Sequence, residues 1–207
     1  MPAFETYLFA PLIEDPAAFR PRLQAALAAL RPASVLLRFG EGDERALINR
    51  LKALAPVAQE AGVAALLEGP ANVAVRGGAD GAHMGAPALL PEARETLRGE
   101  RILGAGGLSS RHDAMEAGEI GVDYVMFGEP RPDGSLMPFS ALLDRASWWA
   151  QLFETPCVAY APTPESVEKL AWTRAEFIAL GPWCFEDPEA AAETVRRARA
   201  NAEAQPG

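Results

Sequence analysis

Four polar side chains each follow a short apolar run, the place where an α/β protein carries its chemistry. They are Arg38, Glu68, His83 and Glu129. The carboxyl ends of parallel strands meet at one rim, so such residues converge although they are far apart in sequence. An arginine fork can hold a phosphate, an imidazole can orient a ligand or move a proton, and two carboxyls can do acid–base work. We predict a small-molecule site here, with His83 and Glu68 as the candidates for catalysis.

Each of these side chains also has a structural interpretation that the sequence leaves open. Arg38 and Glu68 are expected on neighbouring strands, where they can form an ion pair. His83 can hydrogen-bond within the rim, and Glu129 can be solvated or pair with Arg131. No spacing establishes that the two carboxyls face each other. The sequence is therefore compatible both with a ligand-binding site and with purely structural contacts between these side chains.

A glycine-rich segment adds a further candidate ligand-binding element. Gly104, Gly106 and Gly107 follow an apolar run, and such a turn can bring backbone N–H groups close to an anion or a ring. The same glycines also suit any junction between a strand and a helix. The segment lacks the third glycine of the G-x-G-x-x-G fingerprint, which argues against a dinucleotide site.

The elements that must position these residues alternate between short apolar runs and longer amphipathic ones. This alternation is typical of a parallel sheet with helical crossovers. Eight units in a chain of 207 residues predict a (β/α)8 TIM barrel, in one domain covering residues 1–207, rather than an open sheet of five or six units. The predicted strands are 7–13, 34–39, 63–67, 81–84, 101–105, 123–127, 157–160 and 177–180.

Capping residues and proline mark where several of the helices begin. Asp15, Asp43 and Asp187 are predicted N-caps, and either Ser109 or Ser110 caps the helix that ends near residue 120. Short side-chain oxygens are preferred there because they accept a hydrogen bond from a free backbone N–H. The remaining helices are expected at 71–77, after Pro91, at 141–152 and at 164–172.

Composition limits the classes of partner. The 19 basic and 28 acidic residues give a net charge of −9, which argues against nucleic acid and anionic membranes, because both need a positive surface. No apolar run approaches the length of a membrane span, and the first residues lack the features of a signal peptide. Cys157 and Cys184 have no metal-ligand spacing. We expect a cytoplasmic protein with reduced, buried thiols.

One bulky apolar group indicates a second kind of contact. It comprises Trp148, Trp149, Leu152 and Phe153. A helix can bury only one face against the barrel, so we expect core packing for at least two of the four and a homodimer contact for part of the rest.

Several segments resemble the thiamine phosphate synthase family, which includes a thiazole tautomerase branch. Residues 79–85 (ADGAHMG) and 121–128 (GVDYVMFG) are similar to family motifs at the fourth and sixth strands, and residues 36–38 (LLR) to one at the second. The resemblance implies a (β/α)8 barrel over most of residues 33–200. Asp80 and Asp123 lie in these motifs but directly precede strands, so we expect them to cap turns at the opposite end of the barrel.

The resemblance implies a transferase, a thiamine-phosphate diphosphorylase, that uses Mg²⁺ to neutralise a departing diphosphate. In the family, carboxylates after the third and fourth strands hold the metal. Here these positions read Glu68-Gly-Pro70 and Ala86-Pro-Ala88, so Glu68 is the one carboxylate left. A family lysine is replaced by Gly40, and a Gly-Gly phosphate turn by Ala161-Pro162. Mg²⁺ is thus implied by the resemblance while its ligands are replaced.

Three hypotheses remain open at this point. The first is a synthase-like protein of thiamine biosynthesis or salvage that binds a thiazole phosphate or a pyrimidine ester. The second is a non-catalytic protein that binds a small phosphorylated or heteroaromatic ligand, and the third a dimeric interaction protein on the same barrel. The tautomerase branch uses a histidine after the fifth strand, and the nearest one here, His112, lies within the following helix.

Overall fold

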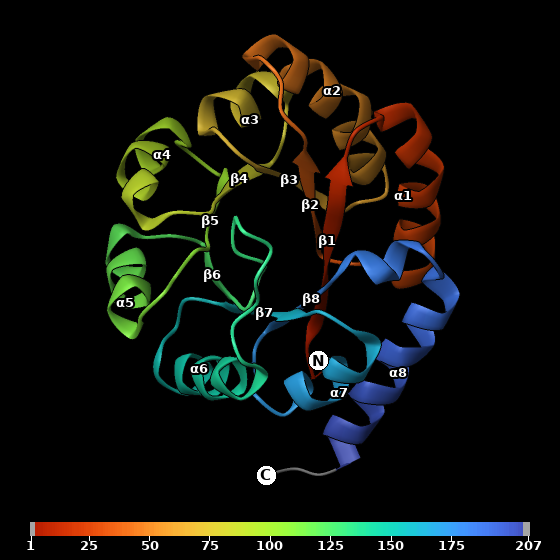
Figure 1. Cartoon of the computed structure of the whole chain (residues 1–207), viewed down its shortest axis with the longest axis vertical. Helices are drawn as coiled ribbons and strands as arrows, with labels where there is room; N and C mark the ends of the chain where they lie inside the picture. The colour runs from red at the N-terminus through yellow and green to blue at the C-terminus, as the bar shows by residue number, and fades with distance from the viewer. Residues whose placement is uncertain (1–2, 205–207) are drawn as a thin grey trace.

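The computed structural model describes residues 3–204 and confirms the predicted (β/α)8 barrel (Figure 1). Its strands pair in parallel in chain order, and pairing of the first with the last closes the ring. The strands are β1 (Glu5–Ile13), β2 (Ser34–Phe39), β3 (Ala64–Glu68), β4 (Gly81–Met84), β5 (Ile102–Ala105), β6 (Tyr124–Phe127), β7 (Cys157–Ala161) and β8 (Phe177–Leu180).

Helices surround the barrel as an outer ring (Figure 1). They are α1 (Pro16–Leu30), α2 (Glu44–Glu60), α3 (Ala71–Gly77), α4 (Leu90–Thr96), α5 (Arg111–Ile120), α6 (Phe139–Leu152), α7 (Pro164–Ala171) and α8 (Pro188–Ala204), with short 3-10 helices η1 (Pro87–Leu89) and η2 (Pro182–Phe185). The predicted elements are all present. Where a predicted end differs from the observed one, it does so by one or two residues, as expected where helix and strand ends fray.

The predicted caps begin the helices as expected. The side chain of Asp15 accepts a hydrogen bond from Ala17 N at 2.8 Å, and that of Asp43 accepts one from Ala46 N at 2.7 Å. For α5 the N-cap is Ser110 rather than Ser109, because Ser110 Oγ accepts from the backbone N–H of Asp113. These local bonds fix where each strand-to-helix loop ends.

Two layers of buried side chains hold the barrel together. One lies between the strands and the helices and is almost wholly aliphatic and aromatic. The other fills the interior of the barrel with Tyr7, Phe9, Leu36, Leu66, Tyr124, Met126, Val158, Tyr160 and Ala179. Buried tyrosines keep a polar tip that needs a hydrogen-bond partner. The interior layer therefore combines packing with polar contacts below the rim.

Acidic residues close the amino end of the barrel. Asp80, Asp123 and Glu176 each directly precede an even-numbered strand, and each accepts a hydrogen bond at 2.7 Å from a backbone N–H at the start of the preceding strand. The prediction that Asp80 and Asp123 serve the end opposite the site is confirmed. Their carboxylates supply acceptors for amides that the strand ladder leaves without a partner.

The apolar group at the end of α6 packs both on the barrel core and on itself. Trp149 is fully buried and stacks on Phe153 with ring centroids 4.0 Å apart, and Trp148 meets Phe153 edge-on at 5.1 Å. Leu152 is 68% exposed. Core packing of at least two members is confirmed, while the homodimer stays a prediction.

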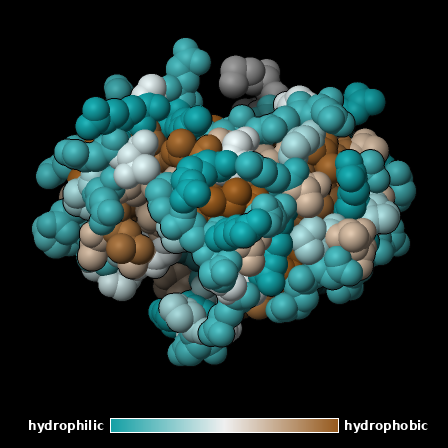
Figure 2. Space-filling view, turned by 90° about the horizontal axis from the view of Figure 1, so that it is seen from above, coloured by the Kyte–Doolittle hydropathy of each residue, from teal (hydrophilic) through white to brown (hydrophobic). Residues whose placement is uncertain are grey.

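The surface is largely hydrophilic, with small apolar patches scattered over the face in Figure 2. Both cysteines, Cys157 and Cys184, are free and buried, as predicted. Within residues 3–204 we find no helix that is both long and apolar enough to cross a bilayer.

Candidate functional site at the carboxyl rim

The four polar residues predicted from the sequence lie at the carboxyl ends of four strands, β2, β3, β4 and β6. Arg38 lies on β2, and Glu68 and His83 are register partners on β3 and β4. Arg38 Nε donates a hydrogen bond to Glu68 Oε2 at 2.6 Å, and its guanidinium lies 4.4 Å from the centroid of the Phe9 ring. The ion pair is thus present. It holds the arginine fork at the mouth of the barrel.

His83 points inward and joins the rim to the barrel interior. It is 1% exposed, and its Nδ1 lies 2.9 Å from the hydroxyl of Tyr124. The two rings also stack, with centroids 5.7 Å apart. Burial, assisted by the positive charge of Arg38, lowers the pKa of His83 to about 3. The imidazole is therefore neutral at physiological pH.

Gly104 makes room for this contact rather than for a ligand. We predicted it both in the strand 101–105 and in the glycine turn, and it lies within β5 between His83 and Tyr124 in register. A Cβ on Gly104 would stand 2.1 Å from Tyr124 Cζ, so no side chain fits. The prediction that Gly104 belongs to the turn is wrong. The empty position on β5 allows residues of β4 and β6 to meet across that strand.

The true turn, at Gly106 and Gly107, brings Glu129 beside His83. A Cβ on Gly106 would lie 2.4 Å from His83 Nε2 and 2.5 Å from Glu129 Oε1, so both groups face the same small space. Gly107 has a positive φ of 65° and donates its backbone N–H to Glu129 Oε1 at 2.6 Å. The loop amide is therefore already bonded to a carboxyl.

The Glu129 carboxyl is the group of the rim that titrates near neutrality. Burial raises the pKa of Glu129 to about 7, against the opposing effect of the hydrogen bond from Gly107. The pairing with Arg131 that we considered does not form, since Arg131 bonds Ser135 instead. A carboxyl poised near pH 7 is suited to accepting or releasing a proton.

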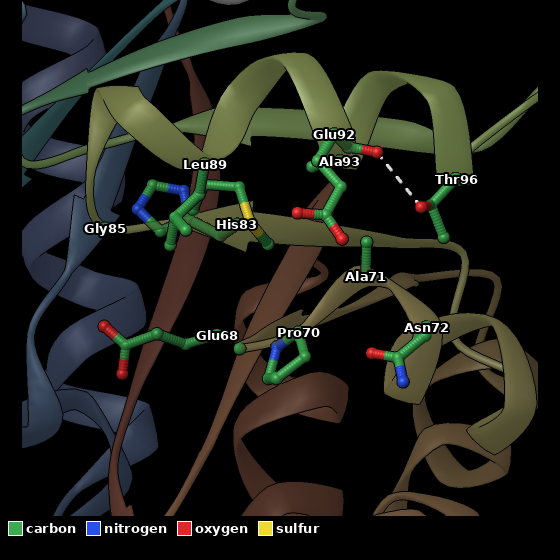
Figure 3. Close-up of a pocket in the computed structure, with 12 residues that line it drawn as sticks. Glu68, Pro70, Ala71, Asn72, His83, Gly85, Leu89, Glu92, Ala93 and Thr96 are labelled. Atoms are coloured by element: carbon green, nitrogen blue, oxygen red, sulfur yellow. Dashed lines mark hydrogen bonds between the residues drawn. The ribbon is translucent and has the colours of Figure 1, made fainter.

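A pocket of about 390 Å³ adjoins these residues between α3 and α4 (Figure 3). Glu68 and His83 lie at one end, and Asn72 and Thr96 lie at the other. Glu92 directs its carboxylate between them (Figure 3). The remaining lining is mostly apolar and includes Pro70, Ala71, Met84, Leu89 and Ala93. Two carboxylates and no lysine or arginine line the pocket, so it suits a neutral or cationic group better than an anion.

Neither His112 nor a cluster of metal ligands contributes to the rim in the part of the chain that the structure describes. His112 lies on the exposed side of α5, where it is 3.4 Å from Glu116, and it takes no part in the rim. Within residues 3–204, no three histidine, cysteine, aspartate or glutamate side chains gather closely enough to hold a metal ion.

Sequence reasoning missed the tyrosines beneath the rim. The hydroxyls of Tyr7 and Tyr124 lie 2.9 Å apart, and Tyr124 connects this pair to His83. The sequence could have indicated that these tyrosines form hydrogen bonds, because both residues lie on predicted buried strands and a buried phenol needs a hydrogen-bond partner. The partner could not be named from sequence, since Tyr7 and Tyr124 lie 117 residues apart, on β1 and β6.

Comparison with known proteins agrees with this architecture. The thiamine-phosphate synthase of Rhodospirillum centenum is 38% identical over 192 residues, which cover 91% of this chain and 93% of that protein. The thiamine-phosphate synthase of Hyphomonas neptunium is 37% identical over 204 residues, which cover 92% of this chain and 91% of that protein.

Solved structures share the fold at lower identity. A thiamine phosphate pyrophosphorylase from Pyrococcus furiosus superposes with a TM-score of 0.76 over 97% of both chains, at 20% identity. The family model described as thiamine monophosphate synthase matches residues 7–181. Given this match, together with relatives above one-third identity over nearly the whole length, the chain belongs to the thiamine monophosphate synthase family.

Proposed function

We propose that this protein binds a thiazole phosphate or a pyrimidine ester of thiamine biosynthesis or salvage at the carboxyl rim of the barrel. The observation that carries the proposal is the convergence of Arg38, Glu68, His83 and Glu129, from four different strand ends, beside a pocket large enough for a small heterocycle. Membership of the family supports the substrate class, because its relatives bear the name of the synthase.

Arg38 is the residue that we assign to the phosphate. Its Nε bonds Glu68, and its Nη1 lies 3.4 Å from the carbonyl oxygen of Ala10. No residue in the range 3–204 takes a hydrogen bond from Nη2, so this nitrogen is available to an incoming oxygen. An arginine held in place by an ion pair and an aromatic ring loses little freedom on binding a phosphate.

The residues at the rim do not fit a magnesium–diphosphate group. Mg²⁺ prefers octahedral oxygen ligands and is usually held by one or two carboxylates together with phosphate oxygens. Glu68 is occupied by Arg38 at 2.6 Å, and Glu129 accepts from Gly107 at 2.6 Å. In the pocket, Pro70 and Leu89 stand among the lining residues, and the carboxylates there would repel a diphosphate. We therefore propose that binding is independent of the metal.

Calorimetric titration with thiazole phosphate and with a pyrimidine diphosphate, each with and without Mg²⁺, tests the proposal. We expect thiazole phosphate, which carries no diphosphate for the pocket carboxylates to repel, to bind equally well with and without the metal. Arg38→Ala should weaken that binding at least tenfold, as expected for the loss of a charged hydrogen bond. Arg76→Ala is the matched control, because Arg76 is an exposed arginine of α3 that pairs with Glu44.

Two results would overturn the proposal. If neither ligand binds to the folded protein, the assigned site is wrong. If binding requires Mg²⁺, or if a mixture of both ligands with Mg²⁺ yields thiamine phosphate and diphosphate, the metal-independent assignment fails. Thermal unfolding of Arg38→Ala and Arg38→Lys, measured in parallel, separates a binding defect from loss of the fold.

A further inference from the structure

Three buried polar side chains form a continuous line from the barrel interior to the rim. The hydroxyl of Tyr7 lies 2.9 Å from that of Tyr124, which in turn lies 2.9 Å from His83 Nδ1. Tyr7 and His83 are each 1% exposed and Tyr124 is 6% exposed. At these distances each contact is a hydrogen bond, so each must have one donor and one acceptor.

The protonation states of the three groups are fixed by burial. Desolvation raises the pKa of both tyrosine hydroxyls and lowers that of His83 to about 3. All three side chains are therefore neutral at physiological pH, and each carries one hydrogen that can take part in the line. Only the direction in which the hydrogens point remains to be decided.

Counting hydrogens decides between the two directions. If Tyr7 donates to Tyr124 and Tyr124 donates to His83 Nδ1, every hydrogen in the line has an acceptor. If Nδ1 carries the hydrogen instead, either Tyr7 or Tyr124 must donate outside the line, and no other residue in the range 3–204 accepts from either hydroxyl. A water in the cavity of about 200 Å³ at the amino end would have to accept it, but that cavity is almost entirely apolar and a trapped water needs several polar partners.

Glu129 favours the same direction from the other side of the imidazole. His83 Nε2 and Glu129 Oε1 both lie within 2.5 Å of the point that a Cβ on Gly106 would occupy. A carboxylate is an acceptor, so an N–H on Nε2 is attracted to it, whereas a bare lone pair would be repelled. Because Glu129 ionises near pH 7, this preference is strongest above neutrality.

We propose that Tyr124 is a positioning residue that, with its own hydroxyl accepting from Tyr7, holds His83 in the Nε2–H tautomer, so that the rim presents a neutral hydrogen-bond donor beside the Glu129 carboxyl. His83 then acts as a donor to an acceptor atom of the ligand, either a ring nitrogen or a phosphate oxygen, and Glu129 is the group that takes up a proton. The tautomer is a property of the protein alone, whereas its use in recognition rests on the proposed function.

Nitrogen NMR of the full chain labelled at histidine tests the tautomer without any ligand. The chain has two histidines, so the rings of His83 and His112 give separate, assignable signals. At pH 8 we expect His83 to carry its hydrogen on Nε2 and to keep it there in Tyr7→Phe, where Tyr124 still donates. In Tyr124→Phe, Nδ1 loses its donor, and we expect the Nδ1–H form to appear at pH 6, where Glu129 is mostly protonated and no longer favours an N–H on Nε2.

Tyr160→Phe is the matched control, because Tyr160 is another tyrosine of the barrel interior that makes no hydrogen bond to His83. It should leave the tautomer unchanged. A His83 ring protonated on Nδ1 in the unmodified chain would overturn the proposal, and so would a tautomer that Tyr124→Phe does not alter.

A binding measurement separates this proposal from the proposed function. If thiazole phosphate or the pyrimidine ester binds, Tyr124→Phe should lower its affinity by about tenfold and Tyr160→Phe should not. If the NMR result holds and neither ligand binds, the positioning role stands while the substrate assignment falls. If a ligand binds with unchanged affinity in Tyr124→Phe, His83 does not donate to it and its role in recognition is wrong.

Discussion

The ring of Tyr124 occupies the space in which a side chain on Gly104 would stand. A Cβ at that glycine would lie 2.1 Å from Tyr124 Cζ and 2.2 Å from its hydroxyl oxygen. Because β5 is empty at this position, Tyr124 on β6 reaches across it to His83 on β4. The contact between these two rings therefore depends on a residue that has no side chain.

We expect Gly104→Ala to destabilise the fold by about 1 to 3 kcal/mol, the usual cost of an added methyl in a packed interior. Chemical denaturation measures this change in the free energy of unfolding. Combining it with Tyr124→Leu should cost less than the sum of the two single changes, since the residues share one space. Gly85→Ala is the control, as a Cβ there has no neighbour within 4 Å. Additive costs would show that the two residues do not compete for space.

Gly106→Ala is expected to damage the site more than the fold. The new Cβ would collide with His83 Nε2 and Glu129 Oε1, and relieving the collision must separate the two groups. We expect at least a tenfold loss of ligand affinity, measured by calorimetry, in a protein that still unfolds cooperatively. Unchanged affinity would mean that the ligand does not need His83 and Glu129 side by side.

The raised pKa of Glu129 predicts a pH dependence of stability. The folded state holds this proton up to about pH 7, while the unfolded state releases it near pH 4.5. Stability that is present below the unfolded value is thus lost as the pH rises through the folded value. We expect the free energy of unfolding of the unmodified chain to fall relative to Glu129→Gln between these values, by about 1 to 3 kcal/mol because the side chain is partly accessible.

Denaturant titrations at several pH values measure this difference. Glu95→Gln serves as a control, since Glu95 is an exposed carboxylate of α4. The prediction fails if Glu129→Gln and the unmodified chain keep a constant difference from pH 4 to pH 8.

Variants at the amino end should separate stability from binding. Asp80→Ala leaves the N–H of Ala65 without its acceptor, which should cost about 1 to 2 kcal/mol. Because Asp80 lies at the end of the barrel opposite the site, ligand affinity in the folded protein should not change. Thermal unfolding measures the loss of stability and calorimetry measures the ligand affinity. Asp144→Ala is the control, because Asp144 is exposed. A loss of affinity at full stability would contradict this division.

Local patterns were sufficient to predict most of the elements. The apolar runs predicted all the strands, and Asp15 and Asp43 begin their helices as expected, because a cap acts within three residues of itself. Gly104 shows where this reasoning failed. The sequence suggested both the strand 101–105 and the glycine turn for it, and only the pairing of β5 with β6 brings the ring of Tyr124 into the space beside it.

The sequence by itself determined the alternation of strands and helices, and with it a closed barrel whose rim gathers Arg38, Glu68, His83 and Glu129. Strand order and the common direction of parallel strands are enough to collect these residues at one end. Only the tertiary structure decided what they do to one another. His83 meets Tyr124 of β6 and, through it, Tyr7 of β1, and the burial that shifts the pKa of His83 and that of Glu129 exists only when the ring is closed and packed.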